Sequence, residues 1–148
     1  MNPLAIDIRK KLIALGAGVD GTLFPTADWS IHANAYPAKP ARIIAVYNTG
    51  TQHQHVLGTR YTFETSTFQL RVRGLSPAES EEKIELIHDL LERIGLFTMP
   101  PVVAGGHAVR YLDILVTLGP LPMGRDEHDW SSHVVTMKTF REDIIPAS

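Results

Sequence analysis

The strongest structural signal in the sequence is a capped amphipathic helix that begins after Ser76. Ser76 is a favourable N-cap residue, Pro77 suits the first turn of a helix, and Glu79 completes a capping box three residues after the serine. Apolar residues then recur every three or four positions until Gly95 ends the pattern; they are Ile84, Ile87, Leu90, Leu91 and Ile94. The sequence therefore predicts a long helix with one buried face in the middle of the chain.

Segments typical of β-strands lie on both sides of this helix. Each is rich in β-branched or aromatic residues and is bounded by turn-forming residues. The predicted strands are residues 42–48, 67–73, 109–118 and 133–140. In the third strand, alternation predicts one face formed by Leu112, Ile114, Val116 and Leu118, with Gly119 and Pro120 ending the strand.

A second amphipathic helix is predicted at residues 4–15, where apolar side chains recur at helical spacing before Gly16 and Gly18. The order of elements has no alternating β-α-β period. The expected fold class is therefore α+β. We expect a small, mostly antiparallel four-stranded sheet with the long helix and the N-terminal helix packed on one face.

The length of 148 residues predicts a single domain over residues 1–148. Residues 19–41 carry Pro25, Pro37 and Pro40 without a sustained period, which predicts an extended arm or loop laid over its own domain or a neighbour. Residues 49–60 are expected to be a polar loop, and residues 142–148 a short flexible tail.

Composition excludes several classes of protein. The formal net charge is -2, and the sequence contains no block of basic residues that would bind nucleic acid through its phosphates. The chain has no cysteine, so disulfides and thiolate metal sites are excluded. Since neither a membrane-spanning apolar run nor a signal peptide is evident, we expect no membrane association and a cytoplasmic place of assembly.

Catalytic signatures are weak. The chain has no nucleophile elbow, and its glycine pair Gly105-Gly106 lacks the lysine and helix of a phosphate-binding loop. His53 and His55 could join the acidic cluster at residues 126–129 in a metal-dependent hydrolase, but a solvated pair and a polar hairpin loop explain these residues better. The prediction is a non-enzymatic protein with no catalytic, metal or cofactor-binding residue and no cofactor.

Seven residues are candidates for contacts with other protein molecules. Arg71 and Arg73 share one strand face, which is either solvated or turned toward an acidic partner or DNA. Aromatic residues contribute strongly to interfaces, and Trp29 and Tyr36 lie in the predicted arm. The remaining candidates, Arg125, Asp126 and Glu127, lie in the turn before the last strand.

The order of segments over about residues 40–141 resembles a phage tail-terminator family, whose members are often labelled minor capsid proteins. The resemblance is carried by Val46-Tyr47-Asn48-Thr49-Gly50, by Phe68-Gln69-Leu70-Arg71-Val72-Arg73-Gly74, by the capped helix from Ser76, and by Gly124-Arg125-Asp126-Glu127. These motifs are short and non-catalytic. The histidine-containing stretch at residues 51–60 is longer than the family pattern.

This resemblance implies a structural virion protein of the phage neck. It implies a tail terminator that forms a ring, usually a hexamer, which caps the tail tube and joins it to the head-side connector. DNA would pass through the ring without specific binding, and the particle would assemble in the host cytoplasm. A head-closure or other head-tail joining protein is an alternative, and an adaptor that binds a peptide along a sheet edge is a further one.

Overall fold

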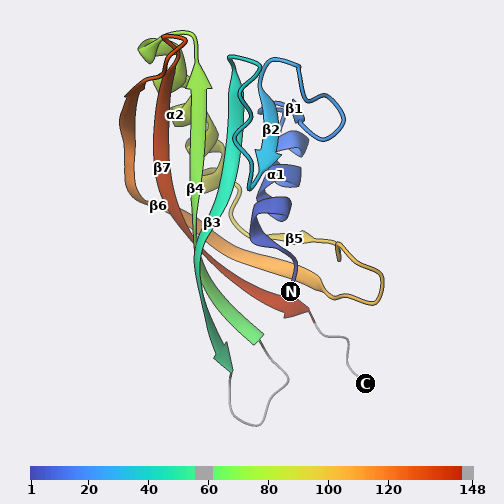
Figure 1. Ribbon diagram of the computed structural model, residues 1–148. Coiled ribbons are helices and arrows are strands. Elements are labelled where there is room, and N and C mark those ends of the chain that lie inside the picture. Colours follow the sequence, from blue (N-terminus) through green and yellow to red (C-terminus); the bar gives the residue numbers. More distant parts are fainter. Residues whose placement is uncertain (56–61, 145–148) are drawn as a thin grey trace.

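The computed structural model describes residues 1–55 and 62–144, and its main feature is a curled, mixed sheet with two helices on one face (Figure 1). The sheet has seven strands in the order β1-β2-β3-β4-β7-β6-β5. The helices are α1 (Leu4–Ala14) and α2 (Pro77–Arg93). The strands are β1 (Val19–Asp20), β2 (Ser30–Ala33), β3 (Ile43–His55), β4 (Thr62–Gly74), β5 (Phe97–Met99), β6 (Ala108–Arg125) and β7 (Ser131–Ile144).

The α+β class is confirmed, whereas the predicted four-stranded sheet is too small. The four predicted strands correspond to β3, β4, β6 and β7, which pair in an antiparallel manner. The three missed strands, β1, β2 and β5, contain two to four residues each, too few for a periodic pattern. Because β2 pairs in parallel with β1 on one side and with β3 on the other, the sheet is mixed.

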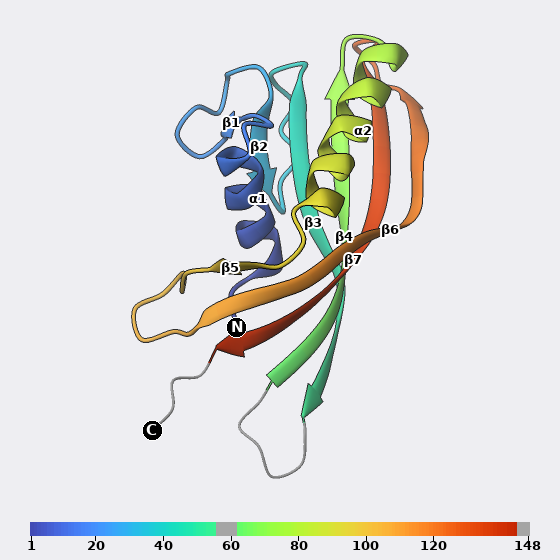
Figure 2. The same ribbon diagram turned by 180° about the vertical axis from the view of Figure 1, so that it is seen from behind.

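Both helices pack against the same face of the sheet, as the view from behind shows (Figure 2). Along the strands, alternate residues such as Phe68 and Leu70 point into this core. The helical stripe predicted for α2 packs into the same cluster, with Leu90 and Ile94 only partly buried. Ser76 caps α2 by accepting a hydrogen bond from the Glu79 N–H at 3.2 Å. Core residues from the helices include Leu4, Ile8, Leu12, Ile84, Ile87 and Leu91.

The prediction of a polar loop at residues 49–60 is wrong for residues 49–55, where β3 continues as an antiparallel partner of β4. This part of the hairpin extends past the helices (Figures 1 and 2). The exposed residues 48–52 are polar, so no apolar alternation marks the strand. At the other end of the chain, β7 continues through residues 142–144, and residues 145–148 lie outside the described part.

The predicted single apolar face of the third strand is also wrong. Register shifts occur in β6 between Tyr111 and Asp113 and between Val116 and Leu118. Ile114 is therefore buried in the core, whereas Leu118 is 58% exposed. β6 also continues past Gly119 to Arg125, with further bulges. Such an extra residue in one strand reverses the alternation that a sequence pattern assumes.

A buried polar network joins the N-terminus of α1 to the sheet. The Arg141 guanidinium donates to Glu64 Oε1 at 2.9 Å, to the Asn2 carbonyl at 2.8 Å and to the Tyr111 hydroxyl at 3.1 Å. Tyr111 donates in turn to Asp7 Oδ2 at 2.8 Å. All five residues are more than 90% buried, so each charged or polar group needs the partner that another supplies.

Asp7 gives this network a pH dependence. Burial raises the pKa of Asp7 above its ordinary value, although hydrogen bonds from Tyr111 and Asn2 oppose the shift. The protonated form of Asp7 consequently favours folding, and its ionised form opposes folding. Stability contributed by the protonated form is complete below the pKa of the unfolded chain and is lost as pH rises through the raised pKa.

We predict that the free energy of unfolding of the wild-type chain, relative to Asp7→Asn, falls as pH rises from the ordinary aspartate pKa through the raised one. Above that window the difference should be constant, because Asp7 is then ionised in both states. Urea unfolding of both proteins over a pH series measures it. A difference that increases with pH over the window would contradict the dominant effect of burial on Asp7.

Candidate functional site

Six of the seven candidate residues gather at one end of the sheet, here called the arm end. Strand register aligns Ser30, Ile43, Arg73 and Ser132 in one row across β2, β3, β4 and β7. The segment between β2 and β3, the C-terminal part of β4 and the β6–β7 turn all lie at or near this row. Trp29 comes directly before this row in the sequence. Its side chain lines a separate pocket together with residues of α2.

Arg73 fixes the segment between β2 and β3 to the sheet. Its guanidinium donates to the carbonyls of Pro37 at 2.9 Å, Pro40 at 2.6 Å and Ala41 at 3.1 Å. The guanidinium also lies 5.0 Å from the ring centroids of both Tyr36 and Trp130. Arg73 is only 4% exposed, so the expectation of a solvated arginine is wrong here. The guanidinium tolerates this burial because the neighbouring carbonyls accept its hydrogen bonds.

Tyr36 and Arg71 complete this contact. The Tyr36 hydroxyl and Ser132 Oγ are 2.8 Å apart, which joins the segment to β7. Arg71 lies half-buried between two aromatic rings, 6.0 Å from the Tyr36 centroid and 5.6 Å from the Tyr47 centroid. These positions suit cation–π attraction, which is stronger where solvent is reduced.

The β6–β7 turn is held by its own acidic residues. Asp126 Oδ1 accepts hydrogen bonds from the backbone N–H groups of His128 at 2.9 Å and Trp130 at 3.0 Å. Arg125 pairs with Asp129 at 2.9 Å, while the Glu127 side chain is 88% exposed. The acidic cluster therefore builds a hairpin turn, as the structural interpretation of the sequence expected.

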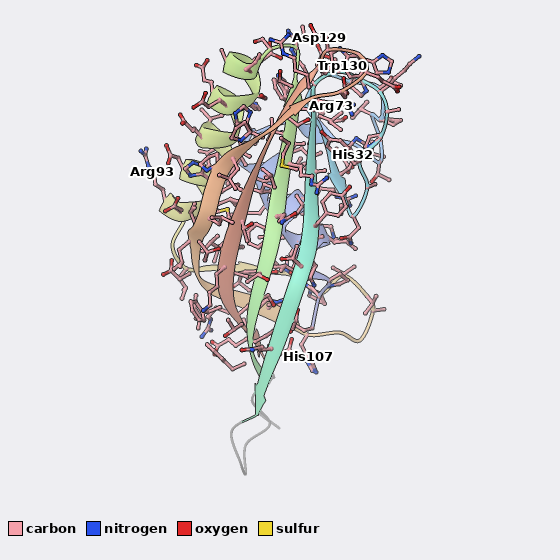
Figure 3. The ribbon with its side chains drawn as sticks, turned by 60° about the vertical axis from the view of Figure 1, so that its left-hand side comes forward. His32, Arg73, Arg93, His107, Asp129 and Trp130 are labelled. Carbon is pink, nitrogen blue, oxygen red and sulfur yellow. The ribbon has the colours of Figure 1, made fainter. Side chains whose placement is uncertain are left out.

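Trp130 was missed as a functional candidate. Its ring contacts Arg73 and lies 4.6 Å from the His128 ring, so it connects the β6–β7 turn to the buried arginine. Figure 3 shows Arg73, Asp129 and Trp130 together at the arm end. An aromatic residue directly after an acidic turn was the available signal, but the sequence could not place it over an arginine from β4.

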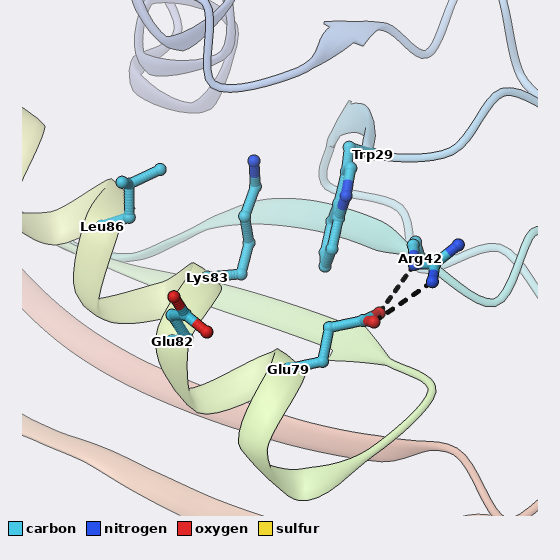
Figure 4. Close-up of a pocket in the computed structure, with 6 residues that line it drawn as sticks. All are labelled: Trp29, Arg42, Glu79, Glu82, Lys83 and Leu86. Carbon is cyan, nitrogen blue, oxygen red and sulfur yellow. Dashed lines mark hydrogen bonds and ion pairs between the residues drawn. The ribbon is translucent and has the colours of Figure 1, made fainter.

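Trp29 lies in an open pocket of about 390 Å³ (Figure 4). Its backbone φ is 58°, an uncommon conformation for a non-glycine residue. Lys83 Nζ from α2 lies 4.8 Å from the Trp29 ring centroid, and burial lowers the pKa of Lys83. Arg42 connects the two walls by donating to Glu79 at 2.7 Å. The lining residues are Trp29, Arg42, Glu79, Glu82, Lys83 and Leu86.

The residues of the metal-dependent hydrolase hypothesis do not converge. The backbones of His53 and Glu64 are register partners, whereas Arg73 lies beside the β6–β7 turn. Glu64 and Arg73 lie nine positions apart on β4, which corresponds to about 30 Å along the strand. The side chains of residues 53–55 lie outside the description. At such a separation His53 and the acidic turn cannot share one metal ion.

His88 on α2 is half-buried and lies near two acids. Its Nδ1 lies 3.1 Å from Glu92 Oε1 and 3.5 Å from Asp89 Oδ1. The potential ligand atoms of this trio lie within 4.8 Å of one another. The His88–Glu92 spacing of four residues is an ordinary side-chain pair on a helix surface.

Comparison with known proteins identifies the family. The family described as "Bacteriophage tail terminator protein" matches residues 11–142. This range includes strands β1 to β6, most of β7 and the whole of α2. The chain belongs to this family. The terminator is thus a structural protein of the phage neck and a component of the virion, as the resemblance implied.

A solved structure shares the fold of the terminator. A chain from "Virion of native gene transfer agent (GTA) particle" matches with a TM-score of 0.54 and 14% sequence identity, and the match covers 95% of each chain. The search of curated proteins gave no match. None of the helices in the described ranges of the terminator combines the length and the apolar character needed to cross a membrane.

The contacts of Arg73 can be tested by substitution. In Arg73→Met the carbonyls of Pro37, Pro40 and Ala41 lose their donor, and we expect a loss of about 2–4 kcal/mol in the free energy of unfolding. Urea unfolding measures this loss. As a matched control, Arg125→Met removes an exposed ion pair and should cost roughly 0.5 kcal/mol or less. Equal losses in the two variants would contradict a special role for Arg73.

Proposed function

We propose that the terminator assembles into a ring of identical subunits, a hexamer, that caps the tail tube and joins it to the head-side connector. Membership of the tail terminator family over residues 11–142 is the observation that carries this proposal. A ring requires two different surfaces on each subunit that meet head to tail. The chain offers the arm end and the long strands of its sheet as extended surfaces.

The proposed ring has no catalytic activity and uses no cofactor. The polar candidates at the arm end support a structural use, because their polar atoms already have partners within the subunit. Arg73 donates to carbonyls, Asp126 accepts from backbone N–H groups, and Arg125 forms an ion pair. In this proposal Tyr36, Arg71, Glu127 and Trp29 are available to contact neighbouring molecules.

DNA passes through the proposed ring without specific binding. Firm attachment to DNA requires several cationic side chains that displace counterions from phosphates. The formal net charge of the terminator is -2, which provides no overall attraction. We further propose that the ring joins the virion during assembly in the host cytoplasm.

We predict that the purified terminator forms rings visible by electron microscopy, either alone or on the end of tail tubes. Light scattering should give six times the subunit mass of 16.4 kDa for a free ring. Added during polymerisation of the tail tube protein, the terminator should stop growth at one end of each tube. Tube protein without the terminator is the control.

A terminator that stays monomeric and leaves tube length unchanged would contradict the proposal. Binding to the head-side connector alone, without binding to tubes, would favour a head-closure role instead.

A further inference from the structure

The outer edge of β6 is open over much of its length. β5 pairs with β6 only from Val109 to Tyr111. Beyond this point, in residues 1–55 and 62–144, no strand pairs with β6 on the side away from β7. Figure 2 shows β6 as the outermost long strand of the sheet. Residues 112–118 therefore present backbone hydrogen-bonding groups without a strand partner.

A second open edge lies on the opposite side of the same sheet. β2 pairs with β3 only from Ile43 to Val46, and the following residue of the segment, Asn34, donates to the Val46 carbonyl at 2.8 Å. From Asn48 to Gln52, β3 pairs with β4 on one side, and on the other side no strand of the described chain pairs with it. The extended hairpin thus carries its own open edge.

Charge and proline protect these two open edges only sparsely, although each edge contains a β-bulge. Free strand edges are commonly guarded by lysine, proline or inward-pointing charges. Residues 48–52 contain no proline and no lysine, arginine, aspartate or glutamate, and residues 112–118 contain a single charged residue, Asp113. Prolines occur in β6 only beyond the open stretch, at Pro120 and Pro122. The exposed Leu118 adds apolar surface at the end of this stretch.

We propose that the open edge of β6 in one terminator subunit pairs with the open edge of β3 in the next subunit. This inference deepens the proposed ring by naming the partner surface. The occupant is a second copy of this chain, because the two edges are unlike, of similar length and on opposite sides of one sheet. Head-to-tail association uses both edges of each subunit, whereas pairing of β6 with β6 would leave the β3 edge open.

The directions of the strands agree with this pairing. β3, β4, β7 and β6 alternate in direction, so β3 and β6 of one subunit run opposite to each other. A rotation about an axis roughly parallel to the strands preserves these directions. The β6–β3 junction between neighbouring subunits is therefore antiparallel, and the sheet continues from one subunit to the next.

Cysteine cross-linking tests the junction directly, since the chain has no cysteine of its own. Double variants combine a cysteine at Thr49, Thr51 or Gln52 with one at Asp113, Thr117 or Leu118. Facing residues of antiparallel strands have the Cα separation that a disulfide requires. Under mild oxidation, at least one combination should give a ladder of covalent oligomers in denaturing electrophoresis.

Single-cysteine variants provide the first control, because an unlike junction brings no residue against its own copy. A double variant with cysteines at Leu118 and at Leu86, an exposed residue on α2, provides the second control. Neither control should form a ladder. Efficient dimers from a single cysteine at Thr117 would indicate β6–β6 pairing and overturn the inference.

Electron microscopy of the same samples separates this inference from the proposed function. Rings without a β3–β6 ladder in any combination would overturn the edge pairing and leave the ring intact. A β3–β6 ladder without rings would support the edge pairing and count against the ring. The absence of both would overturn both.

A charge placed on the open edge gives a second measurement. Leu118→Lys should weaken association by about tenfold or more, because a lysine on an edge strand must be desolvated in a continuous sheet. Leu86→Lys, an exposed leucine on α2, is the matched control and should associate like the wild-type chain. Equal association of Leu118→Lys and wild type would contradict the pairing.

Discussion

The buried ion pair between Arg141 and Glu64 is the constraint on which the shape of the terminator depends. Both side chains lie where the apolar core under the helices gives way to the extended strands, and both are almost fully buried. Burying a charge is tolerated only with a partner and further hydrogen bonds, and loss of one partner of such a pair typically costs about 3–5 kcal/mol. Arg141 meets this requirement by recruiting Asn2 and Tyr111, which anchors α1 to β6 and β7.

This anchor separates two regions with different roles. On one side, the helices cover the sheet, and Arg73 holds the segment between β2 and β3 against it. On the other side, β3 and β4 continue beyond the helices, and the edges of β3 and β6 lack strand partners within the described residues. A subunit whose helices cover one part of the sheet, and whose sheet edges are open in the other part, suits the proposed assembly with its own copies.

Local signals in the sequence predicted a large part of this fold. The capping residue Ser76, the stripe of α2 and the alternation in residues 67–73 depend on neighbours within one element, and each was found where expected. Bulges and very short strands depend on distant pairing. For this reason Leu118 was assigned to the wrong face, and β1, β2 and β5 were missed. The strand at residues 49–55 was missed for a related reason, since its exposed residues 49–52 carry no apolar alternation.

The candidate residues show the same division. The structural role of the acidic turn could be predicted, because Asp126 acts on backbone groups only a few residues away. Burial of Arg73 could not, because its three carbonyl acceptors lie more than 30 positions earlier in the chain and Trp130 lies on another strand. The proximity of the Arg71, Tyr36 and Tyr47 side chains likewise follows from the fold and not from any local motif.

The central claim is that copies of this chain close into a ring at the head-proximal end of the tail. A cryo-electron microscopy reconstruction of the neck in intact particles tests it most directly. The account predicts a ring of this chain on the last layer of the tube, with its sheets continuing from subunit to subunit. Density for the chain elsewhere in the particle, or as isolated copies around the neck, would contradict the claim.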